Sequence, residues 1–105
     1  MIRRTPRASL SIGDHAIYLW DHSSPAVVDR FLESVETSLV LLESAPRIGR
    51  LINVRGHPKS RRWTVKGFPN HVLLYREVPE GIELLLLYHA AEDELRVLRE
   101  LIDDL

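Results

Sequence analysis

The apolar positions of residues 61–89 fall into three runs separated by two turn signals. Each run is rich in β-branched, aromatic and aliphatic residues, and such runs bounded by Gly, Pro and Asn are typical of strands joined in hairpins. The predicted turns are residues 66–70, which contain Gly, Pro and Asn, and residues 78–81, with Pro second and Gly fourth as in a type I turn. We therefore predict a three-stranded antiparallel meander, with the preceding residues packed against one face.

The last two predicted strands, residues 72–75 and 82–88, are apolar on both faces, which a sheet covered on one side does not need. A second element is therefore expected to cover the other face. Strict alternation along the last strand predicts one face with Ile82, Leu84, Leu86 and Tyr88, and an opposite face with Glu83, Leu85, Leu87 and His89. Because the second set mixes charge with leucine, it is predicted to form the rim and floor of a groove.

Two helical stripes precede the meander. A short edge strand is expected at residues 2–5, Pro6 suits the first turn of a helix, and apolar residues then recur at helical spacing through residues 8–20. Ser24 as N-cap and Pro25 in the first helical position start a second helix, which ends before Pro46. Its predicted buried stripe is Val28, Phe31 or Leu32, Val35, Leu39 and Leu42. The short connection predicts an antiparallel helical hairpin on one face of the sheet.

Two segments lie outside this α+β pattern. Residues 48–57 contain two glycines and are too irregular to assign, whereas residues 90–105 have leucines at the spacing of an acidic amphipathic helix. That C-terminal helix can fold back over the second apolar face or extend towards a partner, and the sequence leaves both alternatives open.

Length and composition bound the class of protein. A chain of 105 residues predicts a single domain over residues 1–105, and the absence of Cys excludes disulfides and thiolate metal sites. The basic N-terminus is not followed by the apolar run of a signal peptide, and the longest apolar run, residues 84–88, is too short to span a bilayer. We expect a soluble cytoplasmic protein.

The net charge of −1 hides a strong segregation of charge. Residues 46–76 carry eight Lys or Arg and no acid, while residues 77–105 carry nine acids and two Arg. One interpretation is a solvated face neutralised by the acidic tail of the same molecule. The other is a basic patch directed at an anionic partner, either nucleic acid or an acidic protein segment.

Residues that carry chemistry are few. The chain has no Gly-rich phosphate loop, no nucleophile elbow and no metal-ligand spacing among its five scattered histidines, so no metal or cofactor is expected. Guanidinium groups could hold a phosphate while His89 moves a proton, which is how RNA can be cleaved without a metal. The alternatives are a strand-end His89 bonded to a neighbouring helix and a structural His15 at the edge of the core. The candidate set is Arg61, Arg62, Lys66, Arg76, Tyr88 and His89.

Several segments together resemble the ParE branch of the ParE/RelE toxin superfamily. The resemblance lies in residues 63–76 (WTVKGFPNHVLLYR), residues 81–83 (GIE) and residues 88–93 (YHAAED), and residues 5–8 and 46–50 extend it over nearly the whole chain. It implies the toxin of a type II toxin–antitoxin pair of the plasmid-stabilisation type. The implied fold is β-α-α-β-β-β with a C-terminal tail, in agreement with the elements predicted above.

The resemblance also implies partners. Toxins of this superfamily are neutralised by an antitoxin whose C-terminal segment wraps the toxin, often as a helix in a groove with a strand added at the sheet edge. We expect antitoxin contacts at Trp63, Leu85, Leu87 and His89. The resemblance to ParE-like members implies an inhibitor of DNA gyrase that acts by binding, without a catalytic residue. The residues expected to bind that target are Arg61, Arg62, Lys66 and Arg76.

Two other functions stay open, a nuclease and an inactive family member. RelE-like members of the superfamily are ribosome-dependent mRNA endonucleases. A nuclease would use Arg61, Arg62, Arg76 and His89. Val72 stands where one nuclease group has a basic residue, which favours the gyrase branch. Ala90 and Glu92 stand where the ParE pattern has Gly and Arg, so the remaining alternative is an inactive member that only binds its antitoxin.

Overall fold

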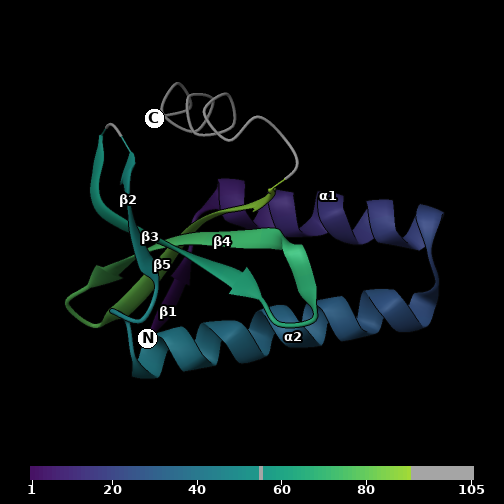
Figure 1. The fold of residues 1–105 in the computed structure, drawn as a ribbon, viewed down its shortest axis with the longest axis horizontal. Coiled ribbons are helices and arrows are strands. Elements are labelled where there is room, and N and C mark those ends of the chain that lie inside the picture. The colour runs from purple at the N-terminus through teal and green to yellow at the C-terminus, as the bar shows by residue number, and fades with distance from the viewer. Residues whose placement is uncertain (55, 91–105) are drawn as a thin grey trace.

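The computed structural model describes residues 1–54 and 56–90 as two helices and a five-stranded sheet (Figure 1). The sheet has the strand order β1-β5-β4-β3-β2, and the two helices pack beside it. The α+β class and the predicted order of elements are confirmed. The elements are β1 (Ile2–Arg4), α1 (Pro6–His22), α2 (Pro25–Ser44), β2 (Arg50–Val54), β3 (His57–Val65), β4 (Phe68–Val78) and β5 (Gly81–His89).

Both edges of the sheet differ from the simple meander. Strand β2 forms within the segment predicted to be irregular and pairs antiparallel with β3. At the other edge β1 pairs parallel with β5, with Ile2 opposite Ile82. The predicted edge strand and meander are thus confirmed, with one additional strand. The predicted C-terminal helix lies, from residue 91 onwards, outside the described residues.

The predicted helix starts are confirmed in atomic detail. The Thr5 hydroxyl accepts a hydrogen bond from the Ala8 N–H at 3.0 Å, and Ser24 accepts one from the Val27 N–H at 3.3 Å. Each cap satisfies an N–H group that the first helical turn leaves without a partner, and a proline follows each cap. The Thr5 hydroxyl also donates to the Leu85 carbonyl at 3.0 Å, so the cap joins α1 to β5.

One hydrophobic core lies between the helices and the sheet. The predicted stripe of α2 is buried there, and its alternative position is settled because Phe31 is fully buried whereas Leu32 is exposed. The main core cluster comprises Ala8, Ile12, Phe31, Val35, Leu39, Leu42, Val65, Leu73, Tyr75, Ile82, Leu84 and Leu87. Neither of the two described helices is long and apolar enough to cross a membrane.

One of the two predicted turns is wrong in length. The structure turns at Lys66 and Gly67 alone, because Val65 already pairs with Phe68 across the hairpin. Gly67 has φ 81°, which a glycine adopts without steric cost, so two residues suffice and residues 68–70 join β4. The other turn is confirmed, since Val78 pairs with Gly81 around Pro79 and Glu80.

The prediction that Leu85 and Leu87 share a face is wrong. Leu74 pairs with Leu86 but Tyr75 pairs with Leu84, so β5 contains one extra residue at Leu85. Such a bulge shifts the alternation of the strand by one residue. Ile82, Leu84 and Leu87 therefore face the helices, whereas Leu85, Leu86 and Tyr88 belong to a second cluster.

That second cluster covers the other face of the sheet. It contains Val72 and Leu74 of β4 together with the three β5 residues, and Ile52 and Val54 of β2 pack against them. Figure 1 shows the β2–β3 hairpin turning up out of the plane of the central strands. The hairpin supplies part of the cover that the two-sided apolar pattern predicted.

Candidate functional site

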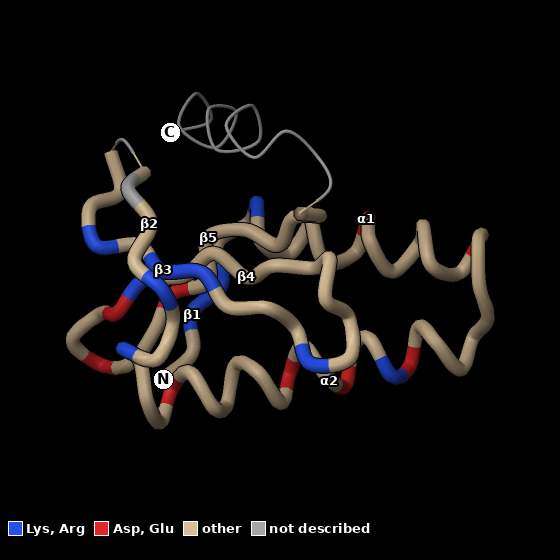
Figure 2. Tube along the Cα trace, viewed as in Figure 1, with Lys and Arg blue, Asp and Glu red and all other residues tan. Residues whose placement is uncertain are grey.

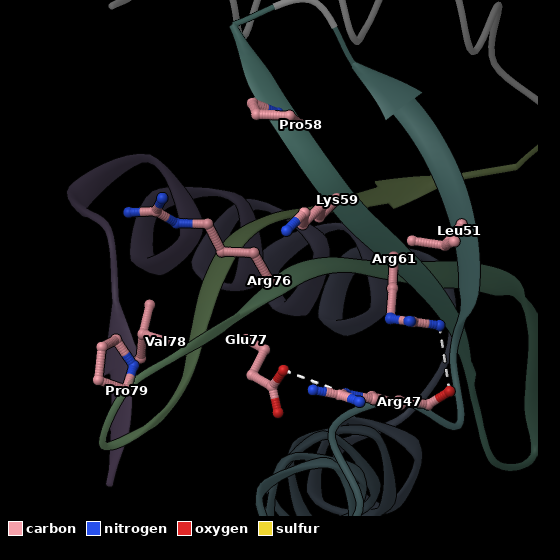
Figure 3. Close-up of a pocket in the computed structure, with 9 residues that line it drawn as sticks. All are labelled: Arg47, Leu51, Pro58, Lys59, Arg61, Arg76, Glu77, Val78 and Pro79. Atoms are coloured by element: carbon pink, nitrogen blue, oxygen red, sulfur yellow. Dashed lines mark hydrogen bonds and ion pairs between the residues drawn. The ribbon is translucent and has the colours of Figure 1, made fainter.

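Basic residues gather at the end of the sheet that carries β2, β3 and the β4–β5 turn (Figure 2). A cavity of about 850 Å³ opens there, which we call the basic pocket (Figure 3). Four cations and one acid line it beside an apolar wall. Its residues are Arg47, Leu51, Pro58, Lys59, Arg61, Arg76, Glu77, Val78 and Pro79.

The guanidinium of Arg61 is held in place by backbone carbonyls. Its Nη1 donates to the carbonyl oxygens of Arg47 at 3.1 Å and Gly49 at 2.8 Å. The segment that carries these carbonyls is itself fixed by Tyr75, whose hydroxyl donates to the Pro46 carbonyl at 2.7 Å and accepts from the Gly49 N–H at 3.0 Å. Only one guanidinium nitrogen is used in these bonds, so the remaining N–H groups of Arg61 can serve a ligand.

Burial keeps the Tyr75 hydroxyl protonated, so that it can hold this segment through hydrogen bonds. Desolvation raises the pKa of its hydroxyl above the ordinary value of 10.0, so the proton donated to Pro46 stays on the oxygen. Gly49 has no room for a side chain, because a Cβ there would lie 2.3 Å from the Tyr75 hydroxyl oxygen and 2.9 Å from the Arg62 carbonyl oxygen. The position of Arg61 thus depends on a close contact between Gly49 and Tyr75.

Two other cations of the basic pocket are paired with carboxylates. The Nε and Nη2 atoms of Arg76 both lie 2.8 Å from Oε1 of Glu83, a residue that is itself buried. Arg47 lies 3.3 Å from Glu77 in an exposed pair, which salt and water weaken. These two acids compensate the charges of Arg76 and Arg47, whereas Arg61 and Lys59 have no acidic partner among the described residues.

Lys59 stands out through its backbone. Its φ of 65° lies in the left-handed region, and no other residue except glycine has a positive φ in the described part of the chain. This conformation costs an ordinary residue about 1–2 kcal/mol. It occurs beside the irregularity in the β2–β3 pairing between Ile52 and Val54. Lys59 has no acidic partner among the described residues.

The other predicted basic residues lie elsewhere. Arg62 points to the opposite face of β3 from Arg61, where it lines a smaller cavity of about 350 Å³ with Ile48, Arg50, Trp63 and Thr64. Lys66 lies in the β3–β4 turn, and its carbonyl accepts a bond of 2.6 Å from Ser34 of α2. The predicted set of four cations is therefore divided over three places, and only Arg61 and Arg76 share one cavity.

His89 belongs to a separate cluster of rings. It is paired with His71 across the sheet, with ring centroids 5.1 Å apart, and His15 of α1 lies 5.2 Å from His71 on another side. His15 and His89 line a cavity of about 350 Å³ with Asp14 and Tyr18. Among the described residues no group of three or more metal-ligating side chains is arranged to hold a metal ion.

Burial governs the chemistry of this cluster. His71 is only 8% exposed, and desolvation, with smaller contributions from the charges of His15 and His89, lowers its pKa from 6.5 to about 4. The Nδ1 atom of His71 has no hydrogen-bond partner among the described residues. At neutral pH His71 is therefore an uncharged part of the core.

The structure does not bring the nuclease set together. Arg61 pairs with Tyr75 on one side of β4, whereas His89 pairs with His71 on the other side. Tyr75 and His71 are four residues apart, which corresponds to about 13 Å along a strand. A proton donor and a phosphate clamp that act on one bond must both contact the same phosphate, so this spacing separates the two roles.

The apolar residues predicted to contact an antitoxin also differ in exposure. Leu85 and Leu87 are 2% and 1% exposed, and Trp63 is half-buried against the main core. Two other apolar side chains are more exposed: Ile48, which lies beside Trp63, is 43% exposed, and Leu51 on β2 is 58% exposed. Sequence reasoning missed these two residues because they lie in or beside a segment without a clear strand pattern. It also missed Lys59, for which no local sequence signal exists.

A comparison with protein families places the chain in one of them. A family model described as the ParE toxin of the type II toxin–antitoxin system parDE matches residues 2–94 of the 105. No curated protein matches the chain. The match spans both helices and all five strands. A toxin of such a system has an antitoxin as its partner. Because the family model matches most of the sequence, the chain belongs to the ParE family of type II toxin–antitoxin toxins.

Proposed function

We propose that this toxin inhibits DNA gyrase by binding it in the cytoplasm, without chemistry of its own. The supporting observation is the division of the nuclease set, because Arg61 and His89 pair with positions of β4 that are four residues, or about 13 Å, apart. The pairing of Arg76 with Glu83 adds to this, because a guanidinium already bound to a buried carboxylate is a poor clamp for a phosphate in a transition state.

The surface proposed to meet gyrase consists of four cations that are half-buried or exposed and lie at three places on the sheet. Arg61 and Arg76 line the basic pocket, Arg62 lies on the other face of β3, and Lys66 projects from the β3–β4 turn. Positive charge of this kind speeds association with an acidic partner and weakens as salt rises. Inhibition by binding should therefore decline between low and moderate ionic strength.

The antitoxin is proposed to bind at the free edge of β2. This strand lies at the end of the strand order and pairs only with β3 in the described part of the chain, so its outer N–H and C=O groups can accept a further strand. Ile48 and Leu51 offer apolar surface there, and Trp63 lies beside Ile48. Contacts at Leu85, Leu87 and His89 stay a prediction, and the buried state of the two leucines favours the β2 edge.

The full-length chain, separated from its antitoxin, tests the proposal in two assays. It should inhibit supercoiling by gyrase and leave mRNA on the ribosome intact. Cleavage of mRNA at the ribosomal A site with unchanged supercoiling would establish the nuclease alternative instead. No effect in either assay, with antitoxin binding retained, would identify the inactive alternative.

The antitoxin surface has its own test. Leu51→Asp places a charge on the exposed side of β2, where no core contact is lost, and should weaken binding of the antitoxin encoded beside the toxin by at least tenfold. Leu10→Asp, at an equally exposed apolar site on α1, is the matched control and should leave that affinity unchanged. Equal effects of the two variants would remove β2 as the docking edge.

A further inference from the structure

We propose that the basic pocket is a binding site for an organic phosphate, either a free nucleotide or a phosphate of a nucleic-acid strand. The pocket adjoins the β2 edge proposed for the antitoxin, because Leu51 of that edge also lines the pocket, and the inference does not depend on gyrase being the target. Its chemistry follows from the charge, the shape and the backbone of the residues that line the cavity.

The charge balance of the pocket leaves two positive charges. Arg47 is paired with Glu77 and Arg76 with Glu83, whereas Arg61 donates only to neutral carbonyl groups in the bonds described above. Lys59 has no acidic partner among the residues that the structure describes. Two cations without an acidic partner among the described residues match the charge of a phosphate monoester, about −1.5 to −2 at pH 7, or of two successive diester phosphates of a strand, better than that of a single carboxylate.

The geometry of Arg61 suits such a ligand. Because Nη1 is fixed to the carbonyls of Arg47 and Gly49, the guanidinium is held in one orientation before a ligand arrives. In Figure 3 the bonded nitrogen points to the Arg47 backbone, and the other two nitrogens lie on the side of Lys59 and Glu77. A planar guanidinium with two free N–H directions can bind a phosphate through two parallel hydrogen bonds.

The size and walls of the cavity indicate that the phosphate carries an organic group. A volume of about 850 Å³ lies within the range of sites for whole small molecules and far exceeds the space of an inorganic anion. Leu51, Pro58, Val78 and Pro79 form apolar walls beside the cations. A base or sugar can pack on these side chains while its phosphate meets Arg61 and Lys59.

The backbone of Lys59 is the independent observation. Gly56 and Gly67 occupy two other positions of positive φ, at 83° and 81°, as expected where only conformation matters. At φ 65° the chain instead has a lysine, whose strain glycine would relieve. Strained residues cluster at functional sites, and here the residue lies beside the register irregularity of β2 and β3 with its side chain lining the basic pocket.

Lys59→Gly provides the decisive variant, because the two consequences have opposite signs. The glycine should raise the melting temperature by relieving strain, while loss of the ammonium should weaken binding of adenosine 5′-monophosphate and inorganic pyrophosphate by about tenfold. Glu77→Gln, which removes the acid of the pocket, should tighten binding of both probes. Lys66→Gly, which removes a cation outside the pocket, is the matched control and should leave both affinities unchanged.

Calorimetric titration of the full-length chain distinguishes the sources of the phosphate. A short single-stranded DNA that binds more tightly than the mononucleotide identifies a strand as the ligand, and equal affinities identify a free nucleotide. Both results support the site. It is overturned if none of the three probes binds, if Lys59→Gly binds them as tightly as the unaltered chain, or if only a glutamate-rich peptide binds.

Discussion

The buried neutral histidine, His71, gives the fold a definite dependence on pH. Its folded-state pKa of about 4 lies below the value of 6.5 that an unfolded chain would show. Between pH 6.5 and pH 4 the unfolded chain binds a proton at His71 that the folded chain does not bind. The free energy of unfolding therefore falls as the pH falls. The contribution is complete above pH 6.5 and is lost as the pH approaches 4.

The size of this effect follows from the two pKa values. Linkage between protonation and folding gives a loss of about 2 kcal/mol between pH 7.5 and pH 5 from His71 alone. The test variant is His71→Phe, which keeps a ring against Phe31 and Phe68 but cannot bind a proton. The variant also removes the buried Nδ1 atom that has no hydrogen-bond partner, so it should be at least as stable as the unaltered chain at pH 7.5.

Urea denaturation of both proteins at pH 7.5 and pH 5 measures the effect. Titrating groups away from His71, including His57, whose pKa burial lowers, are present in both proteins and cancel in the difference. His15 and His89 contact His71, so the difference reports the whole histidine cluster. The unaltered chain should lose about 2 kcal/mol more than the variant between the two pH values. Equal losses would show that His71 is not held neutral by burial.

Two further predictions concern the parts that fix the fold and the pocket. Gly49→Ala should lower the free energy of unfolding by about 1–3 kcal/mol, because its Cβ would meet the Tyr75 hydroxyl and the Arg62 backbone. Urea denaturation measures this cost, and a value near zero would show that the contact is loose. Thr5→Ala should lower the free energy of unfolding by about 1–2 kcal/mol, and by more than Ser24→Ala does, because Thr5 both caps α1 and donates to the Leu85 carbonyl. A lower melting temperature for Ser24→Ala than for Thr5→Ala would contradict this.

Local signals predicted the helices and most of the sheet. The Ser24 and Pro25 pair, the helical spacing of Val28, Val35, Leu39 and Leu42, and the Pro79 turn each depend on near neighbours, so the sequence determines them directly. The choice of Phe31 over Leu32 was left open, because both lie within the same stripe and only packing against Phe68 and the sheet decides it.

The missed features depend on contacts between distant segments. Strand β2 forms because β3 offers it an edge, although its own pattern is weak. The bulge at Leu85 arises from the pairing of β5 with β4, and a single extra residue reversed the predicted faces of the strand beyond it. A period of two along one strand cannot show where such a bulge occurs.

The candidate site was predicted least well for a similar reason. The block of cations was visible in the sequence, but Arg61 and Arg62 point to opposite faces of β3 and Glu83 neutralises Arg76 from the neighbouring strand. The left-handed conformation of Lys59 has no sequence signal, since a lysine seldom adopts it.

The central claim, toxicity by binding and not by cleavage, is tested most directly by inducing the His89→Ala variant in bacterial cells without the antitoxin. Growth arrest equal to that of the unaltered toxin, relieved by the neighbouring antitoxin gene, is the predicted result, because His89 lies apart from the cations of the basic pocket. Normal growth with the variant, at equal protein level and with antitoxin binding intact, would contradict the account and assign His89 a chemical role.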